Sequence, residues 1–380
     1  MRRILNRTGR AEGSTTVNKA LKIAAGVVAA LILAAAIYVA YVMASYYRLD
    51  DSLALEVEAP ADGSTLPELA AQDAELTVVA ANLGFGAYGP DFDFFMDGGT
   101  GSVAKSAEEV RANIEGSADA IKELSPDFVL FQEADTDGTR SHHVDEYALL
   151  RQAFPGFASV FAQNYDSPYL AWPPYAPHGA NRAGMVTFTR FAADDALRRS
   201  LPISDSLSKF LDLDRCYSIT RIPLESGADL VLFNVHLSAY GADAAIMEGQ
   251  RQMLYEDMVR ERDAGNYVIA GGDFNHDMIG VSNEVFGNQT DTDASWAKPF
   301  DFTGVPEGFS VLAKEQLDAG TFDSAATCRD AGRAYDGTND RWVMDAFICS
   351  SNVTCLEQRT LDLDFAYSDH NPVYLRFTLS

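Results

Sequence analysis

The feature that most constrains the fold is an apolar strand that ends in polar side chains, a pattern that recurs along the chain. Its clearest example is residues 267–275, where Tyr-Val-Ile-Ala-Gly-Gly predicts a buried strand before Asp273, Phe274 and Asn275. The two glycines are expected to let the backbone turn sharply where the strand ends. Because Asp273 and Asn275 are two residues apart, an extended segment places both side chains on one face. A carboxylate beside a carboxamide suits metal binding, orientation of water and contact with a phosphoryl oxygen, although Asp-x-Asn after Gly-Gly is also ordinary turn chemistry.

Five further segments show the same pattern. Their polar residues are Asn82, Gln132-Glu133, Asn234 with His236, Asp345, and Ser368-Asp369-His370. Asp345 stands alone among apolar residues, and a buried carboxylate needs a partner, for which a histidine or Arg341 is available. Taken singly, His236 fits a buried structural histidine equally well, and Asp369-His370 fits a surface turn.

Apolar runs are separated by helical patterns in some places and by turns in others, which predicts an α/β sandwich of mixed sheets rather than a barrel. The expected strands are 76–82, 127–131, 157–161, 184–189, 216–224, 230–236, 267–273, 342–350 and 373–379. Helices are expected at 106–124, which Ser106 and Glu109 open as a capping box, at 144–154 and at 242–262. A long aromatic loop is expected at 163–183 and irregular structure at 278–340.

The N-terminal region predicts a membrane anchor. Residues 23–47 carry no charge, exceed the roughly 20 residues that cross a bilayer, and gather tyrosines at the C-terminal end. A cleaved signal peptide is the alternative, but no small-x-small cleavage site follows the span. The basic residues precede it, so residues 1–22 are expected in the cytoplasm and the large domain outside the cell. The sequence predicts an acidic linker at residues 48–75 and the folded domain at residues 76–380.

Charge and cysteine content limit the possible functions. The chain has 29 basic and 55 acidic residues, of which 1–48 hold seven and one, so residues 49–380 have a net charge of −32. A domain this acidic repels polyanions at long range, which argues against a DNA-coating protein and only weakly against a nuclease. None of the four cysteines has zinc-ligand spacing. Cys349 and Cys355 could pair across a turn in an oxidising compartment, and free thiols are equally compatible with the sequence.

The order of these pieces resembles the endonuclease/exonuclease/phosphatase superfamily. The resemblance covers about 76–380 and depends on Asn82, Gln132-Glu133, Asn234-Val235-His236-Leu237, Gly272-Asp273-Phe274-Asn275 and Ser368-Asp369-His370. It implies a four-layer αββα sandwich with the site at the strand ends between two sheets, and dependence on Mg²⁺ or on Mn²⁺ or Ca²⁺.

The resemblance also implies roles for individual residues. Glu133 would be the principal metal ligand, with Asn82 and Asp369 near the ion. Asp273 would orient or deprotonate water, Asn275 would hold a phosphoryl oxygen, and His236 would contact the phosphate or protonate the leaving oxygen. His370 would be the second acid or base, kept in one tautomer by Asp345. Substrate contacts are predicted for Trp172, Arg182 and Arg329, with Thr321 and Asp323 as further candidates.

Three functions remain open at this level. The first is a phosphodiesterase or phosphatase that acts outside the cell on a lipid head group, a nucleotide or another small phosphoester, with the membrane reached through the N-terminal helix and no obligate protein partner. The second is an extracellular nuclease. The third is a membrane-tethered binding protein on a retired enzyme scaffold, which the filled family positions disfavour. The basic loops with which family nucleases grip DNA have no clear counterpart here, and the segment 278–340 matches no subgroup.

Overall fold

The computed structural model describes residues 9–69, 74–206, 209, 213–239, 244–290, 296–322 and 325–380, with side chains from residue 19 onward. The chain divides into two units, 1–47 and 48–380, and the predicted site residues all belong to the second. Asp323 and the start of the helix predicted at 242–262 lie outside the described residues.

The first unit contains the helix α1 (Gly9–Ser45). Its stretch Lys19–Ser45 is long and apolar enough to cross a membrane, and a signal sequence near an N-terminus has the same length and composition.

The second unit is built on two seven-stranded mixed sheets, as the sequence predicted. The first sheet has the order β1 (Leu53–Ala54), β7 (Asp195–Ser200), β8 (Cys216–Pro223), β9 (Asp229–His236), β10 (Tyr267–Asp273), β14 (Asp345–Ser350) and β11 (Phe309–Val311). The second has the order β15 (Val353–Thr360), β16 (Val373–Leu379), β3 (Leu76–Asn82), β4 (Phe128–Gly138), β6 (Asn181–Thr189), β5 (Ala158–Asp166) and β2 (Val57–Glu58). A separate two-stranded ribbon pairs β12 (Cys328–Arg329) with β13 (Arg341–Trp342).

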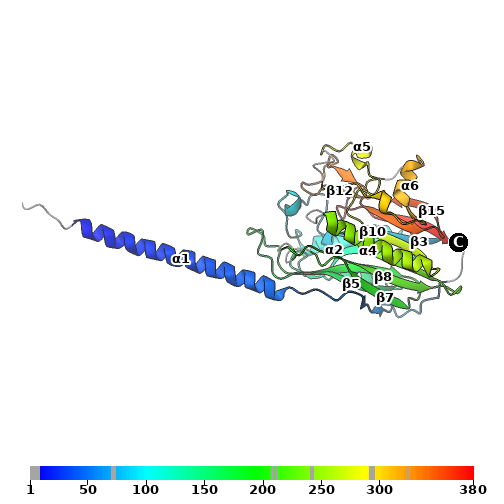
Figure 1. Ribbon diagram of the computed structural model, residues 1–380, viewed down its shortest axis with the longest axis horizontal. Helices are drawn as coiled ribbons and strands as arrows, with labels where there is room; N and C mark the ends of the chain where they lie inside the picture. Colours follow the sequence, from blue (N-terminus) through cyan, green and yellow to red (C-terminus); the bar gives the residue numbers. More distant parts are fainter. Residues whose placement is uncertain are drawn as a thin grey trace, which may run out of the picture. The chain divides into compact units, whose positions relative to one another are not determined.

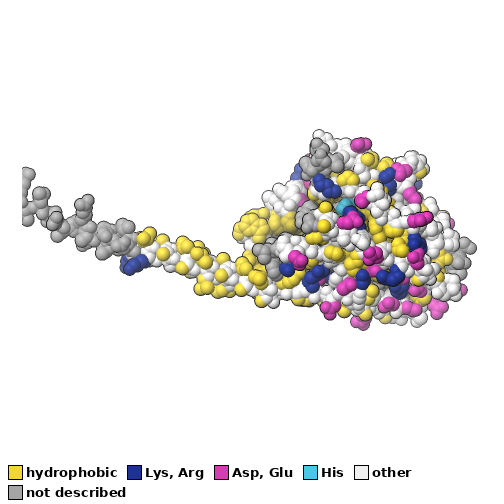
Figure 2. All heavy atoms as spheres, viewed as in Figure 1, with side chains coloured by type: hydrophobic (Ala, Val, Ile, Leu, Met, Phe, Trp, Pro, Cys, Tyr) yellow, Lys and Arg dark blue, Asp and Glu magenta, His cyan; other side chains and the backbone are white. Residues whose placement is uncertain are grey.

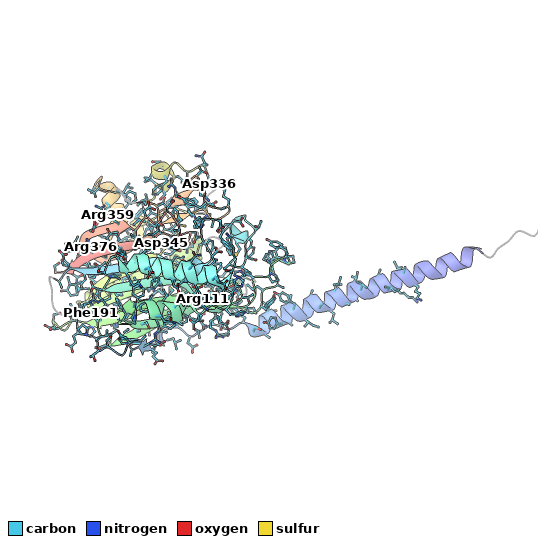
Figure 3. All side chains as sticks on the ribbon, turned by 180° about the vertical axis from the view of Figure 1, so that it is seen from behind. Arg111, Phe191, Asp336, Asp345, Arg359 and Arg376 are labelled. Atoms are coloured by element: carbon cyan, nitrogen blue, oxygen red, sulfur yellow. The ribbon has the colours of Figure 1, made fainter. Side chains whose placement is uncertain are left out.

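Helices cover the outer faces of both sheets (Figure 1). They are α2 (Ala107–Lys122) and α3 (Glu146–Ala153) on the second sheet and α4 (Ala244–Asp263) on the first. The remaining described helical elements of this unit are the short α5 (Ser282–Phe286) and α6 (Leu312–Asp318) and the 3-10 turns η1 (Gly84–Gly86), η2 (Phe95–Asp97) and η4 (Phe302–Gly304). Helix α4 lies in front of the sheets in Figure 1, and α2 lies in front of them when the molecule is seen from behind in Figure 3. The two helices therefore lie on opposite sides of the paired sheets.

Three buried clusters explain the layers. Along β3, Val78 and Ala80 pack with residues of the other sheet such as Leu232, whereas Val79 and Ala81 face the cluster that includes α2. This alternation follows from the two-residue period of a strand. A third cluster joins the outer face of the first sheet to α4. The order is helix, sheet, sheet, helix, and it confirms the predicted αββα sandwich.

The structure confirms the predicted helix cap, and it resolves two points that the sequence left open or described as irregular. Helix α2 begins at its N-cap Ser106, whose side chain accepts a hydrogen bond from the backbone N–H of Glu109. The predicted irregular segment 278–340 contains α5, α6, β11 and β12 as short elements. All four cysteines are free, and Cys349 and Cys355 are not bonded to each other.

The segment predicted as a linker is structured where it is described. Strand β1 pairs with β7 at the edge of one sheet, and β2 pairs with β5 at the edge of the other. Arg48 also binds Asp214, with 2.6 Å between Nε and Oδ1. Residues 48–58 therefore belong to the folded unit, because their backbone completes the edge of each sheet.

Candidate active site

Three predicted residues meet across neighbouring strands of the first sheet. In the register of these strands, Asp273 on β10 lies opposite His236 on β9 and opposite Asp345 on β14. Adjacent strands are about 4.8 Å apart, so an imidazole and two carboxylates emerge side by side at one end of the sheet. All three are buried, with no more than 2% of each residue exposed.

The glycines before Asp273 permit this close packing. Gly272 has φ 135°, and a Cβ added there would come within 2.2 Å of the Val235 carbonyl oxygen. A Cβ at Gly271 would come within 2.5 Å of the Phe347 ring. Strand β10 continues through both glycines to Asp273. The expected sharp turn is therefore wrong: the glycines make room for neighbouring groups inside the strand.

The opposite wall comes from the second sheet, where Asn82 ends β3 and Glu133 lies within β4. The pairing of β4 with β6 shifts register between Phe131 and Ala134, and Glu133 has φ 56°. A non-glycine residue in the left-handed region is uncommon and marks a constrained position. Strand β4 does not end at Phe131 as predicted but continues beyond this bulge.

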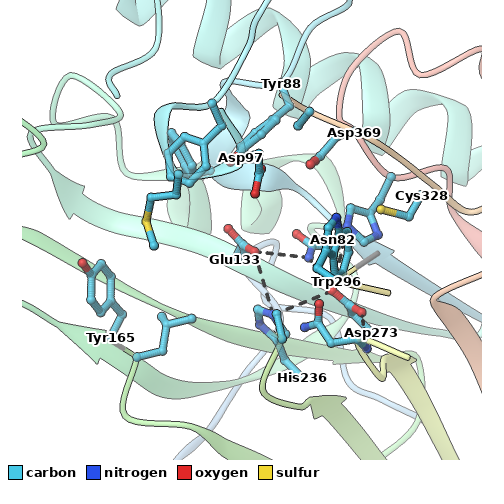
Figure 4. Close-up of a pocket in the computed structure, with 18 of the residues that line it drawn as sticks. Asn82, Tyr88, Asp97, Glu133, Tyr165, His236, Asp273, Trp296, Cys328 and Asp369 are labelled. Carbon is cyan, nitrogen blue, oxygen red and sulfur yellow. Dashed lines mark hydrogen bonds and ion pairs between the residues drawn. The ribbon is translucent and has the colours of Figure 1, made fainter. Parts of the chain in front are cut away.

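Hydrogen bonds join the two walls. The Asn82 Nδ2 donates to Glu133 Oε1 at 3.3 Å and to Asp273 Oδ2 at 3.1 Å. The His236 Nε2 lies 3.8 Å from an oxygen of each carboxylate (Figure 4). Beneath them, Gln132 Nε2 donates to Asn234 Oδ1 at 2.7 Å between the sheets. The side-chain amide of Asn82 thus donates to both Glu133 and Asp273, which are 140 positions apart in sequence.

His370 is held by Asp345, as the sequence predicted. Its Nδ1 lies 2.7 Å from Asp345 Oδ2, and its Nε2 lies 3.9 Å from Asp273 Oδ2. The loop that carries His370 is fixed by Ser368, whose hydroxyl donates to the Asn82 carbonyl oxygen at 2.9 Å. A carboxylate on Nδ1 keeps the proton there and turns Nε2 toward the pocket.

Burial and neighbouring charges shift the pKa values of these groups in different directions. Burial raises the pKa of Asp273 to about 7. Burial also opposes the charged form of His370, but Asp345 and further negative neighbours outweigh it and hold the pKa of His370 well above its usual value. Burial, with the charge of Arg215, lowers the pKa of His236 well below its usual value. The site therefore combines a protonated imidazole with a neutral one, an arrangement suited to proton transfer.

The carboxylates suit a divalent cation. Among the described residues, no Lys or Arg nitrogen lies within 4.0 Å of the side-chain oxygens of Glu133, Asp273, Asp345 or Asp369. Burial raises the pKa of Asp369, as it does for Asp273. Four carboxylates that meet without a Lys or Arg partner, and with histidines as their basic neighbours, are costly unless a cation joins them, and carboxylate oxygens are ligands that Mg²⁺ accepts.

Two groupings of these donors are possible. Ligand atoms of Asp273, Asp345 and His370 lie within 4.8 Å of one another, but Nδ1 of His370 is already bonded to Asp345. Glu133 and Asp369 offer a second set of carboxylate oxygens, and both line the pocket. The Asn82 Oδ1 accepts from the Gly84 N–H at 3.0 Å, so its amide nitrogen faces the carboxylates and positions Glu133.

The groups open into a pocket of about 380 Å³. One end is lined by the predicted residues Asn82, Glu133, His236, Asp273, Asn275, Asp369 and His370. The other end is lined by aromatic and apolar side chains, and Figure 4 shows Tyr165 across the pocket from Asp273. Tyr165 comes from the region that was predicted to be an aromatic loop.

The three predicted substrate residues occupy different positions. Trp172 is 66% exposed, Arg182 pairs with Asp166 at 3.4 Å, and neither lines the pocket. Arg329 does line the pocket, but its Nη2 donates to the carbonyl oxygens of Tyr88 and Gly89. Thr321 does not line it.

Sequence reasoning missed most of the residues that line the rest of the pocket, among them two buried arginines, Arg140 and Arg215. Neither has a motif in the sequence. They are buried because strands distant in sequence come together around them, and no local sequence pattern predicts this.

Fold and site together define a phosphoester hydrolase of the two-sheet αββα class. Residues 82–370 match the family model of the Endonuclease/Exonuclease/phosphatase family, and the chain belongs to that family. The site residues named above all lie within the matched range.

Among curated proteins, the chain is 25% identical over 252 residues to an inositol phosphosphingolipids phospholipase C of Schizosaccharomyces pombe. The match covers 59% of this chain and 58% of that protein, so the chain spans little more than half of its relative.

Solved structures show the same fold. An endonuclease/exonuclease/phosphatase from Beutenbergia cavernae matches with a TM-score of 0.58 and 17% identity, over 81% of this chain and 72% of that one. D. rerio TDP2, complexed with a single-strand DNA product, matches with a TM-score of 0.51 and 16% identity, over 80% and 99% of the two chains.

Proposed function

We propose that this chain is a metal-dependent phosphodiesterase that hydrolyses a lipid-borne phosphodiester. The observation that carries the proposal is the convergence of Glu133, Asp273 and the Asp345–His370 pair on one pocket. Carboxylates at a shared position, with a protonated imidazole beside them, are the groups that in-line displacement at phosphorus requires.

The residues support a balanced hydrolytic step. Asp273 orients a water molecule and accepts its proton as the oxygen attacks phosphorus. The bond from phosphorus to the leaving oxygen breaks, and the leaving oxygen takes a proton from His370, which Asp345 keeps charged. His236 and Asn275 contact the phosphoryl oxygens. Asn275 donates to the Leu237 carbonyl oxygen at 2.8 Å through Nδ2, which leaves one N–H of the amide for substrate.

A divalent cation would be held by Glu133 and Asp369, with Asn82 orienting Glu133. When bound, it supplies Lewis-acid stabilisation of the negative charge on the phosphoryl oxygens. Mg²⁺ is the expected ion, because the donors offered are oxygens.

Three observations favour a lipid substrate. Residues 167–181 contain no charged side chain in a strongly acidic domain, and Tyr169, Trp172 and Tyr175 within them are exposed. Amphipathic aromatic side chains are favoured at membrane interfaces. The apolar helix α1 would keep the domain at a membrane, and the basic residues before it favour an extracellular domain. The phospholipase C relative acts on lipid-borne phosphodiesters by its name.

Surface charge argues against nucleic acid as the substrate. On the face visible in Figure 2, basic side chains occur singly or in small groups among acidic ones. Nucleic-acid binding draws its affinity mainly from basic contacts with phosphates.

A panel of substrates tests the proposal. The full chain in detergent is assayed on sphingomyelin and inositol-containing phosphosphingolipid, on bis-p-nitrophenyl phosphate and on plasmid DNA, with Mg²⁺ and with chelator. The proposal expects Mg²⁺-dependent release of the phosphorylated head group and loss of that activity in Asp273→Asn. Cleavage of DNA in preference to lipid would favour the nuclease instead. Hydrolysis of no substrate would favour a retired binding protein.

A further inference from the structure

The pocket also contains two buried guanidinium groups. Arg140 is 6% exposed and Arg215 is 7% exposed, and both line the pocket. The proposed reaction uses neither of them.

Arg215 is a buried cation without an acidic partner. Among the described residues, no carboxylate oxygen lies within 4.0 Å of its guanidinium nitrogens, and its Nη1 donates to the Leu237 carbonyl oxygen at 2.9 Å. Its Nε is buried without a hydrogen-bond partner. A buried guanidinium is costly unless an anion compensates it, and since the described residues provide none, a bound ligand is a suitable source of that anion.

Arg140 is fixed in place and still has donors to offer. Its Nε and Nη2 bind Asp135 in a fork, with Nη2 2.7 Å from Oδ1, and Nη1 has no hydrogen bond to the described residues. Its guanidinium carbon lies 4.1 Å from the centre of the Phe85 ring and 5.2 Å from that of Tyr165. Stacking and pairing hold the guanidinium rigid, so little side-chain entropy is lost when it binds a ligand.

The two arginines lie beside the acidic cluster. Asp135 pairs with Arg140, so Arg215 carries the uncompensated charge. The charges of both Arg215 and Arg140 act on His236, lowering its pKa. Arg215 immediately precedes β8, and β8 lies two strands, or roughly 10 Å, from β10. Arg215 and Asn275 donate to the same carbonyl oxygen of Leu237, so Arg215 adjoins the proposed reaction site.

We propose that Arg140 and Arg215 form an anion subsite that binds a phosphate group of the substrate other than the one being cleaved. Guanidinium groups suit phosphate oxygens because they donate paired hydrogen bonds. This inference rests on the proposed phosphodiesterase function, and it predicts a preference for phosphodiesters whose head group carries a further phosphate over those, such as sphingomyelin, that carry only one phosphate.

Phosphate binding can be measured independently of catalysis. Inorganic phosphate is titrated calorimetrically into the full chain in detergent with chelator present. Wild type is expected to bind one phosphate per chain. Arg215→Gln is expected to bind it at least roughly tenfold more weakly, because about one charge-assisted hydrogen bond is lost. Arg190→Gln is the matched control, because Arg190 is an exposed arginine outside the pocket. Equal affinity in wild type and Arg215→Gln, or no binding in wild type, contradicts the subsite.

Two further arms complete the test. Arg215→Lys keeps the charge but loses the fork, and an intermediate affinity is expected; this variant replaces Arg215→Gln if the latter does not fold.

Kinetics then compare bis-p-nitrophenyl phosphate with a p-nitrophenyl phosphodiester whose other alcohol bears a phosphate monoester. The kcat/KM ratio of the second substrate to the first is expected to fall at least roughly tenfold in Arg215→Gln. An equal fall for both substrates would assign Arg215 to the scissile phosphate and overturn the proposal. If neither substrate is hydrolysed, the proposed function fails, while the titration still decides the subsite.

Discussion

The Asp345–His370 pair gives the most informative single substitution. Asp345→Asn keeps the size of the side chain and removes the charge that faces His370 Nδ1 at 2.7 Å. Asp345 is 1% exposed and the two atoms form a charge-assisted hydrogen bond. Such a bond contributes about 1.5–3 kcal/mol, and each 1.36 kcal/mol of transition-state stabilisation changes the rate tenfold. We therefore expect kcat to fall roughly 10- to 200-fold.

The same substitution should move the pH profile. Asp345 raises the pKa of His370, so its removal lowers that pKa. His370 acts as the protonated donor, and activity is lost as the pH rises through its pKa. The alkaline limb of kcat in Asp345→Asn is therefore expected at lower pH than in wild type. A pH-rate series with bis-p-nitrophenyl phosphate measures this, and NMR titration of His370 reports the same pKa without turnover.

Asp257→Asn is the control for lost stability. Asp257 is another buried carboxylate of the domain, which accepts from the Tyr217 hydroxyl at 2.5 Å and pairs with Arg199 at 2.8 Å, outside the pocket. This variant is expected to lower the free energy of unfolding without moving the pH profile. If Asp345→Asn keeps the wild-type kcat and pH profile while remaining folded, the assignment of His370 as the proton donor is refuted.

Three further predictions concern the metal, acid stability and the strand glycine. Glu133→Gln is expected to weaken Mg²⁺ binding at least roughly tenfold in calorimetric titration, because a charged oxygen ligand is lost; unchanged affinity would place the ion elsewhere. Burial, with the charge of Arg140, lowers the pKa of His178 to about 4, so the unfolded state binds the extra proton between about pH 6.5 and 4. Stability should fall over that window by up to about 3 kcal/mol, and urea titrations at pH 7 and 4.5 should show a smaller fall in His178→Asn; an equal fall would argue that His178 is not responsible. Gly272→Ala is expected to lower the free energy of unfolding by roughly 3 kcal/mol or to prevent folding. Gly156→Ala, whose Cβ would make only an ordinary van der Waals contact 3.5 Å from Asp62 Oδ2, is expected to be near neutral in thermal melts; similar melts for both would contradict the close contact at Val235.

The strand-end pattern predicted the central part of the molecule well. Asn82, His236 and Asp273 meet at the ends of β3, β9 and β10, because strands that are buried on both faces leave polar side chains at their ends. His370 reaches them from the loop between β15 and β16, so the strand predicted to end at Ser368 is wrong. The Asp345–His370 contact was also predicted, since a lone buried carboxylate needs a partner.

Other features had no local signal. Strand β7 has the sequence Asp-Ala-Leu-Arg-Arg-Ser, in which charges hide the alternation of a strand. Strands β1 and β2 are two residues long and exist because they complete the edges of sheets formed by distant segments. The bulge at Glu133 depends on the pairing of β4 with β6. Arg140 and Arg215 reach the pocket only through tertiary packing, so neither could be selected from spacing or composition.

The most direct test of the central claim is a crystal structure of the chain with Mn²⁺ in place of Mg²⁺, with the ion located by anomalous scattering. The account predicts one ion in the pocket, bonded to a carboxylate oxygen of Glu133 at about 2.1 Å, as for a magnesium-type ligand, with Asp369 close by. An empty pocket at saturating Mn²⁺, or an ion bound away from Glu133, Asp273 and Asp369, would contradict it.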